Sequence, residues 1–255
     1  MTDAIFCAEG LSLSFGGVHA VRDVSFDVQP GEVFTIIGPN GAGKTTVLNL
    51  ISRLYDIEAG GRMLFDGADI SRIPISEVAH RGIARTFQNT ELFEHETVLK
   101  NLLIGRHVHR RTNLFSELLF TPTVRAQEIQ FRQMAEDVID LLDLQRYRNE
   151  IIANLPYGVR KMVEVARALC VEPKLLLLDE PSSGLNPEET EDVEFWLEDV
   201  NKDYGATIIM VEHDMQLVSR VSNRVMAMAD GGVLAIGDYA EIQAHPDVLS
   251  AYLGD

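Results

Sequence analysis

The stretch Gly38–Thr46, which reads GPNGAGKTT, constrains the fold of this chain more than any other segment. It matches G-x-x-x-x-G-K-[ST], follows an apolar run suited to a buried strand (FTIIG), and precedes a helical pattern (TTVLNLISRL). Such a loop lets consecutive backbone N–H groups curl around phosphate, and the helix start adds a favourable dipole. The predicted nucleotide site comprises Gly38, Pro39, Asn40, Gly41, Ala42, Gly43, Lys44, Thr45 and Thr46. Within it, Lys44 is placed to reach the β- and γ-phosphates, and Thr45 to offer its hydroxyl to Mg²⁺.

The length is compatible with one large domain, or with a core domain and a subdomain. The cysteine content is compatible with a reducing compartment. The chain has 255 residues, and its two cysteines, Cys7 and Cys170, are far apart without paired spacing. They fit reduced thiols better than a disulfide framework. No apolar run approaches the roughly 20 residues of a membrane-spanning helix, and the N-terminus does not resemble a secretory signal. We therefore expect a soluble protein that can still dock onto a membrane protein.

The charge balance argues against nucleic acid as a partner. The net charge is −17, from 39 acidic against 22 basic residues. A surface this acidic repels nucleic acid and anionic lipid unless basic groups are concentrated locally. The one such concentration is GRHVHRR, which contains Arg106 and Arg111. Because charge runs usually face solvent, we interpret it as a solvated or interdomain patch.

The pattern of apolar residues divides the chain into three parts. The first third is β-rich and includes a hairpin signature at Asp66-Gly67 (GRMLFDGADI). Residues 97–144 are helical, most clearly in FRQMAEDVIDLLDL, with a break at Thr121-Pro122. The last third alternates strand and helix and contains a second hairpin around Asp230. This organisation predicts an α/β fold with a mostly helical insertion at about residues 90–157.

Two carboxylates follow the apolar strand pattern of LLLLDEP. Asp179 and Glu180 lie at its carboxyl end, where ligands of open α/β sheets gather. We interpret Asp179 as holding Mg²⁺ through water, and Glu180 as polarising the attacking water. By itself the pair could be an ordinary strand end. Together with the phosphate loop it predicts nucleotide hydrolysis.

A histidine and a glutamine are weaker candidates. His213 ends the next strand-like run, ATIIMVEHD, so it should reach the same sheet edge. A single histidine is more often an ordinary polar residue, but its place after a core strand favours a functional role. Gln88, in ARTFQNTELF, lies where the β-rich part meets the helical insertion. Glutamine is a neutral ligand for Mg²⁺ or water, and the local pattern does not decide between that role and a plain polar residue.

Taken together, these motifs resemble the ATP-binding subunits of ABC transporters over essentially the whole chain. The resemblance implies a P-loop NTPase fold of ABC type, with a mixed core sheet, an antiparallel β subdomain and an inserted helical subdomain. The nucleotide-binding core would comprise residues 1–89 and 158–255, and the helical subdomain residues 90–157. ATP and Mg²⁺ are the implied cofactors.

The same resemblance assigns roles to single residues. Gln88 would be the Q-loop residue and a Mg²⁺ ligand beside Thr45 and Asp179, while Glu180 would be the catalytic glutamate and His213 the switch histidine. A further position emerges only from the family pattern. Phe15, in SFGGVHAV, matches the aromatic residue that stacks on adenine; a core position in a strand is the alternative.

The segment NLPYGVRKMVEVARAL occupies the place of the family's signature motif, usually Leu-Ser-Gly-Gly-Gln. In such proteins two subunits pair head to tail, and each signature completes the partner's ATP site. Here Leu155, Pro156, Tyr157 and Gly158 precede a helix expected from Val159 onward. Pro156 replaces the serine and Val159 the glutamine, and each lost hydrogen bond to phosphate costs about 1.5–3 kcal/mol. We expect a working signature whose ATP-driven closure is weakened about tenfold or more.

Leu-x-Tyr-Gly at this place is typical of the branched-chain amino-acid importers, which SSGLNP and the C-terminal HPDVLSAYLGD also resemble. The resemblance implies a second ATP-binding subunit, identical or paralogous, two transmembrane permease subunits, and indirectly a solute-binding protein. It also implies a cytoplasmic, peripheral position on the inner face of the plasma membrane. Relatives in this branch import amides, urea or aromatic acids as well, so the solute stays open.

Two other functions fit the sequence less well, and a third stays open. Non-transport ABC ATPases that act on nucleic acid or ribosomes usually fuse two cassettes or carry a long coiled coil, and this chain has neither. A P-loop kinase would need an acceptor site and would have no use for a signature motif. The ATPase of a two-component exporter differs from an importer subunit only in its partners.

Overall fold

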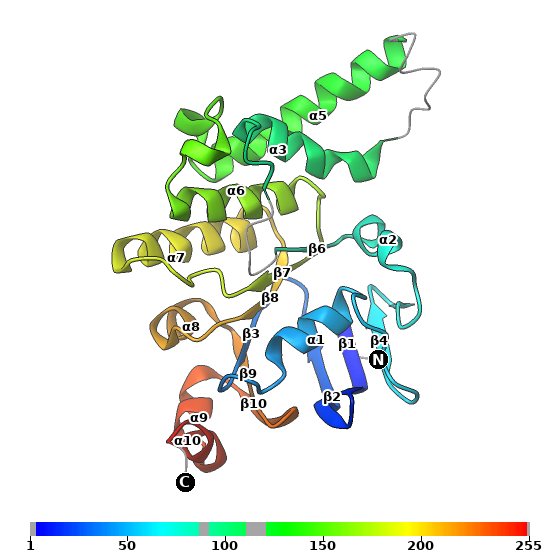
Figure 1. Ribbon diagram of the computed structural model, residues 1–255, viewed down its shortest axis with the longest axis vertical. Helices are drawn as coiled ribbons and strands as arrows, with labels where there is room; N and C mark the ends of the chain where they lie inside the picture. The colour runs from blue at the N-terminus through cyan, green and yellow to red at the C-terminus, as the bar shows by residue number, and fades with distance from the viewer. Residues whose placement is uncertain (1–3, 87–91, 111–120, 254–255) are drawn as a thin grey trace.

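The computed structural model describes residues 4–86, 92–110 and 121–253 (Figure 1). Its core sheet mixes parallel and antiparallel pairing, as the sequence predicted. Strands β9, β3, β8, β7 and β6 run parallel, and β10 pairs antiparallel with β9 at one edge. In spatial order they are β10 (Gly232–Gly237), β9 (Arg224–Ala229), β3 (Val33–Ile37), β8 (Thr207–Val211), β7 (Leu175–Asp179) and β6 (Ile83–Arg85). Every residue of β3, β7 and β8 is buried, which explains their continuous apolar runs.

A second, antiparallel sheet contains the N-terminal strands and the first predicted hairpin. Its strands are ordered β2 (Val18–Val28), β1 (Phe6–Phe15), β4 (Arg62–Phe65) and β5 (Ala68–Asp69). Asp66 and Gly67 join β4 to β5 with φ of 48° and 74°, the two positive values that a tight hairpin turn needs. The second predicted hairpin, β9–β10, is confirmed around Asp230.

Helix α1 (Lys44–Ile51) packs in the apolar core shared by the two sheets. Its buried Val47, Leu48 and Leu50 belong to one cluster with Phe6 of β1 and Phe34 of β3. The phosphate loop that precedes α1 is therefore fixed between two sheets. The short α2 (Ile75–Val78) follows the second sheet.

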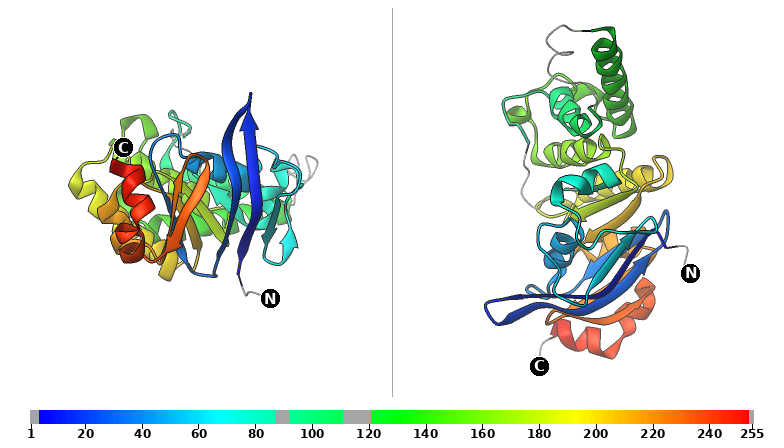
Figure 2. Two further views of the ribbon diagram at one scale, coloured as in Figure 1. Left: turned by 90° about the horizontal axis from the view of Figure 1, so that it is seen from below. Right: turned by 90° about the vertical axis from the view of Figure 1, so that its right-hand side faces the viewer.

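The opposite face of the core sheet carries a separate helical cluster. It contains α3 (Val98–Gly105), α5 (Pro122–Leu141), α6 (Tyr157–Leu169) and α7 (Pro187–Lys202). The outer helices α3 and α5 lie at one end of the molecule, far from the β1–β2 hairpin and the C-terminal helices (Figure 2). Those last helices are α8 (Met215–Val221), α9 (Tyr239–Ala244) and α10 (Pro246–Leu253).

Over the described residues the helical patterns are confirmed, with shifts at their starts. Thr121 and Pro122 do mark a break, because Thr121 occupies the N-cap position of α5, without a side-chain hydrogen bond to the helix, and Pro122 is its first residue. Helix α6, expected from Val159, begins two residues earlier at Tyr157, with Pro156 at the N-cap. Proline fits there because the first amides of a helix have no intrahelical acceptor.

The basic patch is not simply solvated. Arg106 is buried, donates to the carbonyl of Cys170 (2.9 Å), and lies 3.2 Å from the carboxylate of Glu172. Its guanidinium also covers the ring of Phe131. Arg106 thus joins the outer helices to the end of α6, and Arg111 lies outside the described residues. No helix in the described part of the chain is long and apolar enough to cross a membrane.

Candidate nucleotide site

The phosphate loop leaves the carboxyl end of β3 and enters α1. Two of its glycines are needed because neighbouring backbone comes very close. A Cβ on Gly38 (φ 150°) would lie 2.2 Å from the carbonyl oxygen of Met228, and one on Gly43 (φ 95°) 2.3 Å from that of Ala20. The loop therefore packs closely between the backbones of β9 and β2.

Lys44 is buried at the start of α1, and its ammonium group is held by the loop itself. Nζ donates to the carbonyl of Gly38 at 2.7 Å and to that of Pro39 at 3.1 Å. Burial lowers the pKa of Lys44, although the nearby carboxylates of Glu180 and Asp179 act in the opposite direction. Beside it lies a hollow of about 290 Å³, lined by Ala20, residues 40–46 and Glu180.

Asp179 ends β7 and is placed next to the loop. Its Oδ1 accepts from Thr45 Oγ1 at 3.2 Å, and its Oδ2 accepts from Arg85 Nη2 at 3.0 Å. A hydroxyl and a carboxylate are oxygen ligands of the type that Mg²⁺ prefers, and that ion usually keeps waters and binds substrate phosphates. The pair fits a magnesium ion bound together with a nucleotide.

Arg85 was missed by the sequence analysis. Its guanidinium donates to Asp179, to the amide oxygen of Asn49 (2.7 Å) and to the hydroxyl of Ser52 (2.8 Å), and burial lowers its pKa. A signal existed: Arg85 ends a short apolar run, and β6 pairs parallel with β7, so both strands end at one edge.

Glu180 and His213 meet at the same edge, as the strand pattern predicted. His213 Nδ1 lies 4.0 Å from Glu180 Oε2 and 3.9 Å from Glu212 Oε2. Glu180 adopts a left-handed backbone conformation (φ 52°), which is uncommon for a residue with a side chain. Glu212 is fully buried and accepts the amide hydrogens of Ser182 and His213.

Two other residues were predicted for this site. Gln88 lies outside the described residues. Phe15, at the end of β1, is 46% exposed, so it is not a core residue of the strand. Its ring instead contacts Tyr55 edge-on, with 5.2 Å between centroids. The Phe15 side chain therefore stays partly accessible beside Tyr55.

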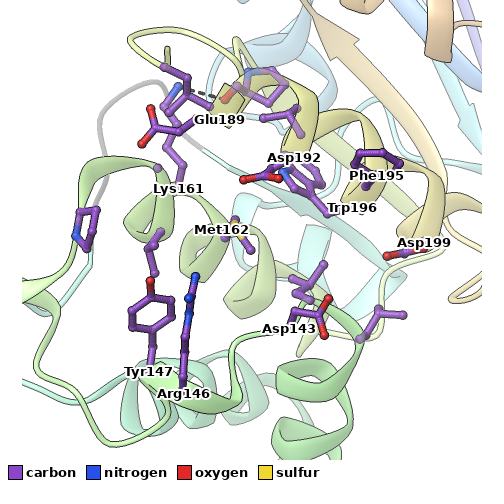
Figure 3. A pocket seen from close by; sticks show the side chains of 18 residues that line it. Asp143, Arg146, Tyr147, Lys161, Met162, Glu189, Asp192, Phe195, Trp196 and Asp199 are labelled. Atoms are coloured by element: carbon purple, nitrogen blue, oxygen red, sulfur yellow. Dashed lines mark hydrogen bonds between the residues drawn. The ribbon is translucent and has the colours of Figure 1, made fainter. Parts of the chain in front are cut away.

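The four signature residues lie away from this hollow, at the start of α6. Leu155 is buried, whereas Tyr157 is 47% exposed and packs on Gly184, where an added Cβ would be 3.1 Å from its ring. Pro156 and Gly158 line a different cavity of about 480 Å³, between α6, α7 and the end of α5 (Figure 3). The first helical hydrogen bond runs from Arg160 N to Pro156 O, so the preceding amides have no helical partner.

Comparison with known proteins identifies the family. Residues 21–183 match the family model described as ABC transporter, and residues 233–255 match that of the branched-chain amino acid ATP-binding cassette transporter. Two relatives are 37% identical over the full length of both chains. They are the high-affinity branched-chain amino acid transport ATP-binding proteins BraF of Pseudomonas aeruginosa and LivG of Escherichia coli.

Solved structures agree with the sequence relatives. An ATP-binding cassette of an ABC transporter in its ADP conformation has a TM-score of 0.86 at 30% identity and covers 100% of both chains. A nucleotide-free cassette gives 0.84 at 30% identity, over 99% of this chain and 100% of its own. With the phosphate loop, Asp179 and Glu180 at one sheet edge, this chain belongs to the ATP-binding proteins of ABC transporters, in the branched-chain amino-acid branch.

Proposed function

We propose that this chain is the ATP-hydrolysing motor subunit of an importer for branched-chain amino acids or a related small polar or aromatic acid. The observation that carries this proposal is the meeting of three groups at one edge of the core sheet: the phosphate loop, the Thr45–Asp179 pair, and Glu180 with His213. The names of the relatives that match the whole chain support the solute class.

ATP would bind beside α1, with Phe15 against adenine and the loop amides around the phosphates. Lys44 would exchange its two loop carbonyls for the β- and γ-phosphates, which is a small movement for a flexible side chain. Thr45 and Asp179 would hold Mg²⁺, and Gln88 is proposed to join them. When bound, Mg²⁺ supplies neutralisation of the phosphate charge.

Glu180 would orient the attacking water and accept its proton. Oxygen of that water bonds to the γ-phosphorus, the bond to the β–γ bridging oxygen breaks, and ADP and phosphate leave. His213 Nδ1 lies 4.0 Å from the Glu180 carboxylate. It would keep the γ-phosphate and this carboxylate in a fixed position relative to each other. Positioning and charge stabilisation supply most of the catalysis in reactions of this type.

A second subunit, identical or paralogous, would bring the start of its own α6 onto this ATP. We propose that the core (residues 1–89 and 158–255) and the helical part (residues 90–157) form the two lobes of this motor. Closure of the dimer would move two permease subunits on the cytoplasmic face of the membrane, with a solute-binding protein delivering the solute.

The test compares Glu180→Gln with Glu188→Gln, a matched change at an exposed glutamate on α7. Loss of a general base costs about 10²- to 10⁴-fold in kcat, so Glu180→Gln should reduce turnover by that factor and Glu188→Gln should not. Lys44→Ala should separately lose nucleotide binding. Wild-type hydrolysis by the Glu180→Gln protein would contradict the mechanism.

Sizing of the Glu180→Gln protein with and without ATP tests the pairing. We expect a dimer only with ATP if Pro156, Tyr157 and Gly158 complete the site of a second copy. A persistent monomer that still binds ATP would instead indicate that closure needs a paralogue or the membrane subunits.

A further inference from the structure

Lys161 is the second buried lysine in the described part of the chain, after Lys44. It lies on α6, one turn after Tyr157, and no motif singles it out. Burial lowers its pKa, although Glu212, Glu164 and Glu180 favour the charged form. A buried ammonium group needs acceptors, because leaving its hydrogens unpaired is costly.

The acceptors are backbone carbonyls next to the proposed catalytic glutamate. Lys161 Nζ donates to the carbonyl of Glu180 at 2.8 Å and to that of Pro181 at 3.3 Å. Figure 3 shows Lys161 extending from α6 at the edge of the cavity. Lys44 has the same arrangement, with two consecutive carbonyls of the phosphate loop as its acceptors.

The turn that Lys161 holds has an unusual shape. Glu180 has φ of 52°, and its carbonyl also accepts from Ser183 N at 3.1 Å, which closes the turn. On the other side, Ser182 N donates to the buried Glu212 at 2.8 Å. A left-handed non-glycine residue persists only when its surroundings hold it, and here a lysine and a buried carboxylate hold the turn from two sides.

The same lysine touches the start of α6. Its ammonium lies 5.6 Å from the ring centroid of Tyr157, and that ring packs on Gly184, two residues after Ser182. The Lys161 side chain and the Tyr157 ring thus link the turn at Glu180 to the start of α6, where the signature residues lie.

We propose that Lys161 is a positioning residue, which fixes the peptides of Glu180 and Pro181 and so aims the Glu180 carboxylate at the attacking water. This role rests on the proposed function of Glu180. Because Lys161 also contacts Tyr157, it couples the helix start that meets the partner's ATP to the glutamate that serves this chain's own ATP.

The test is the steady-state ATPase rate of the full chain, assembled with its membrane subunits, in three variants. Lys161→Met removes the charge and keeps the stem, Lys161→Arg keeps a donor, and Lys202→Met is a control at an exposed lysine whose side chain is 67% accessible. A small misplacement of a catalytic group costs up to about a hundredfold. We expect kcat to fall about tenfold to a hundredfold in Lys161→Met, with KM and ATP affinity within about twofold of wild type.

Lys161→Arg should recover much of the rate, and Lys202→Met should match wild type. Unchanged kcat in Lys161→Met, or an equal loss of ATP affinity, would overturn the role. If Lys161→Met does not fold, Lys161→Gln decides in the same way, and failure of both to fold would indicate a purely structural lysine. No hydrolysis by the wild-type assembly would instead overturn the proposed function itself.

Discussion

The starts of α1 and α6 are both expected to meet phosphate, yet they are built differently. The loop before α1 is clamped by the carbonyls of Met228 and Ala20, and its lysine and its neighbouring carboxylates come from the same chain. The start of α6 offers a proline cap, an exposed tyrosine and free amides, with no serine or threonine hydroxyl. The groups around the start of α1 all come from one chain, whereas the start of α6 is proposed to act on the ATP of a second subunit.

The largest expected effect is a loss of stability when Asp179, the carboxylate beside α1, loses its partner Arg85. Arg85 and Asp179 are a buried pair, with side chains 6% and 1% exposed. Breaking such a pair leaves an uncompensated charge, so Arg85→Met should lower the free energy of unfolding by about 3–5 kcal/mol. Urea denaturation measures the change.

The matched control is Arg160→Met at the start of α6. Arg160 donates to the carbonyls of Leu155 and Ala153, both at 2.9 Å, and neutralises no buried acid in those contacts. We expect a loss of about 1–2 kcal/mol there. If Arg85→Met and Arg160→Met lower the free energy of unfolding equally, contacts within the chain stabilise the two helix starts to the same degree.

A second pair of substitutions compares the glycines. Gly43→Ala places a Cβ 2.3 Å from backbone, whereas the Cβ of Gly158→Ala meets the movable carboxylate of Glu189 at 3.0 Å. Loss of two phosphate hydrogen bonds costs about 3 kcal/mol, so Gly43→Ala should weaken ATP binding to the monomer at least about a hundredfold. Gly158→Ala should leave it unchanged, as measured by titration with a fluorescent ATP analogue. A loss of affinity in both variants would mean that α6 acts on the nucleotide within one chain.

The smallest expected effect is a gain in the affinity of ATP-dependent dimerisation. Pro156→Ser restores a hydroxyl at the α6 cap, and a hydrogen bond to phosphate contributes about 1.5–3 kcal/mol. ATP-dependent dimerisation of the Glu180→Gln, Pro156→Ser protein should tighten about tenfold over Glu180→Gln alone. ATP affinity of the monomer should stay the same, and sedimentation with and without ATP reads out both states. An unchanged dimer constant would show that the serine position does not reach the partner's phosphate.

Much of the site was predictable because its motifs are local. The phosphate loop, Asp179, Glu180 and His213 each follow an apolar run, and parallel strands end at a common edge. The sequence analysis missed Arg85 and Lys161 because their partners are distant in sequence. In addition, Arg85 acts through the Asp179 carboxylate, and Lys161 acts through backbone carbonyls at Glu180 and Pro181. The basic patch was expected to be solvated or interdomain, and Arg106 contacts Cys170 and Glu172 beyond the helical insertion, but a run of charges does not reveal which member turns inward.

The sequence by itself determined the strand–loop–helix unit at Gly38–Thr46, both hairpins and the alternation of strand and helix, because these depend on neighbouring residues and on periodicity. Only the tertiary structure decided that the loop glycines face Met228 and Ala20, that Tyr157 begins α6, and that Lys161 holds the turn at Glu180. Those features depend on which backbone atoms come within a few ångströms of each other. Such distances are set by how whole elements pack, and no local pattern encodes them.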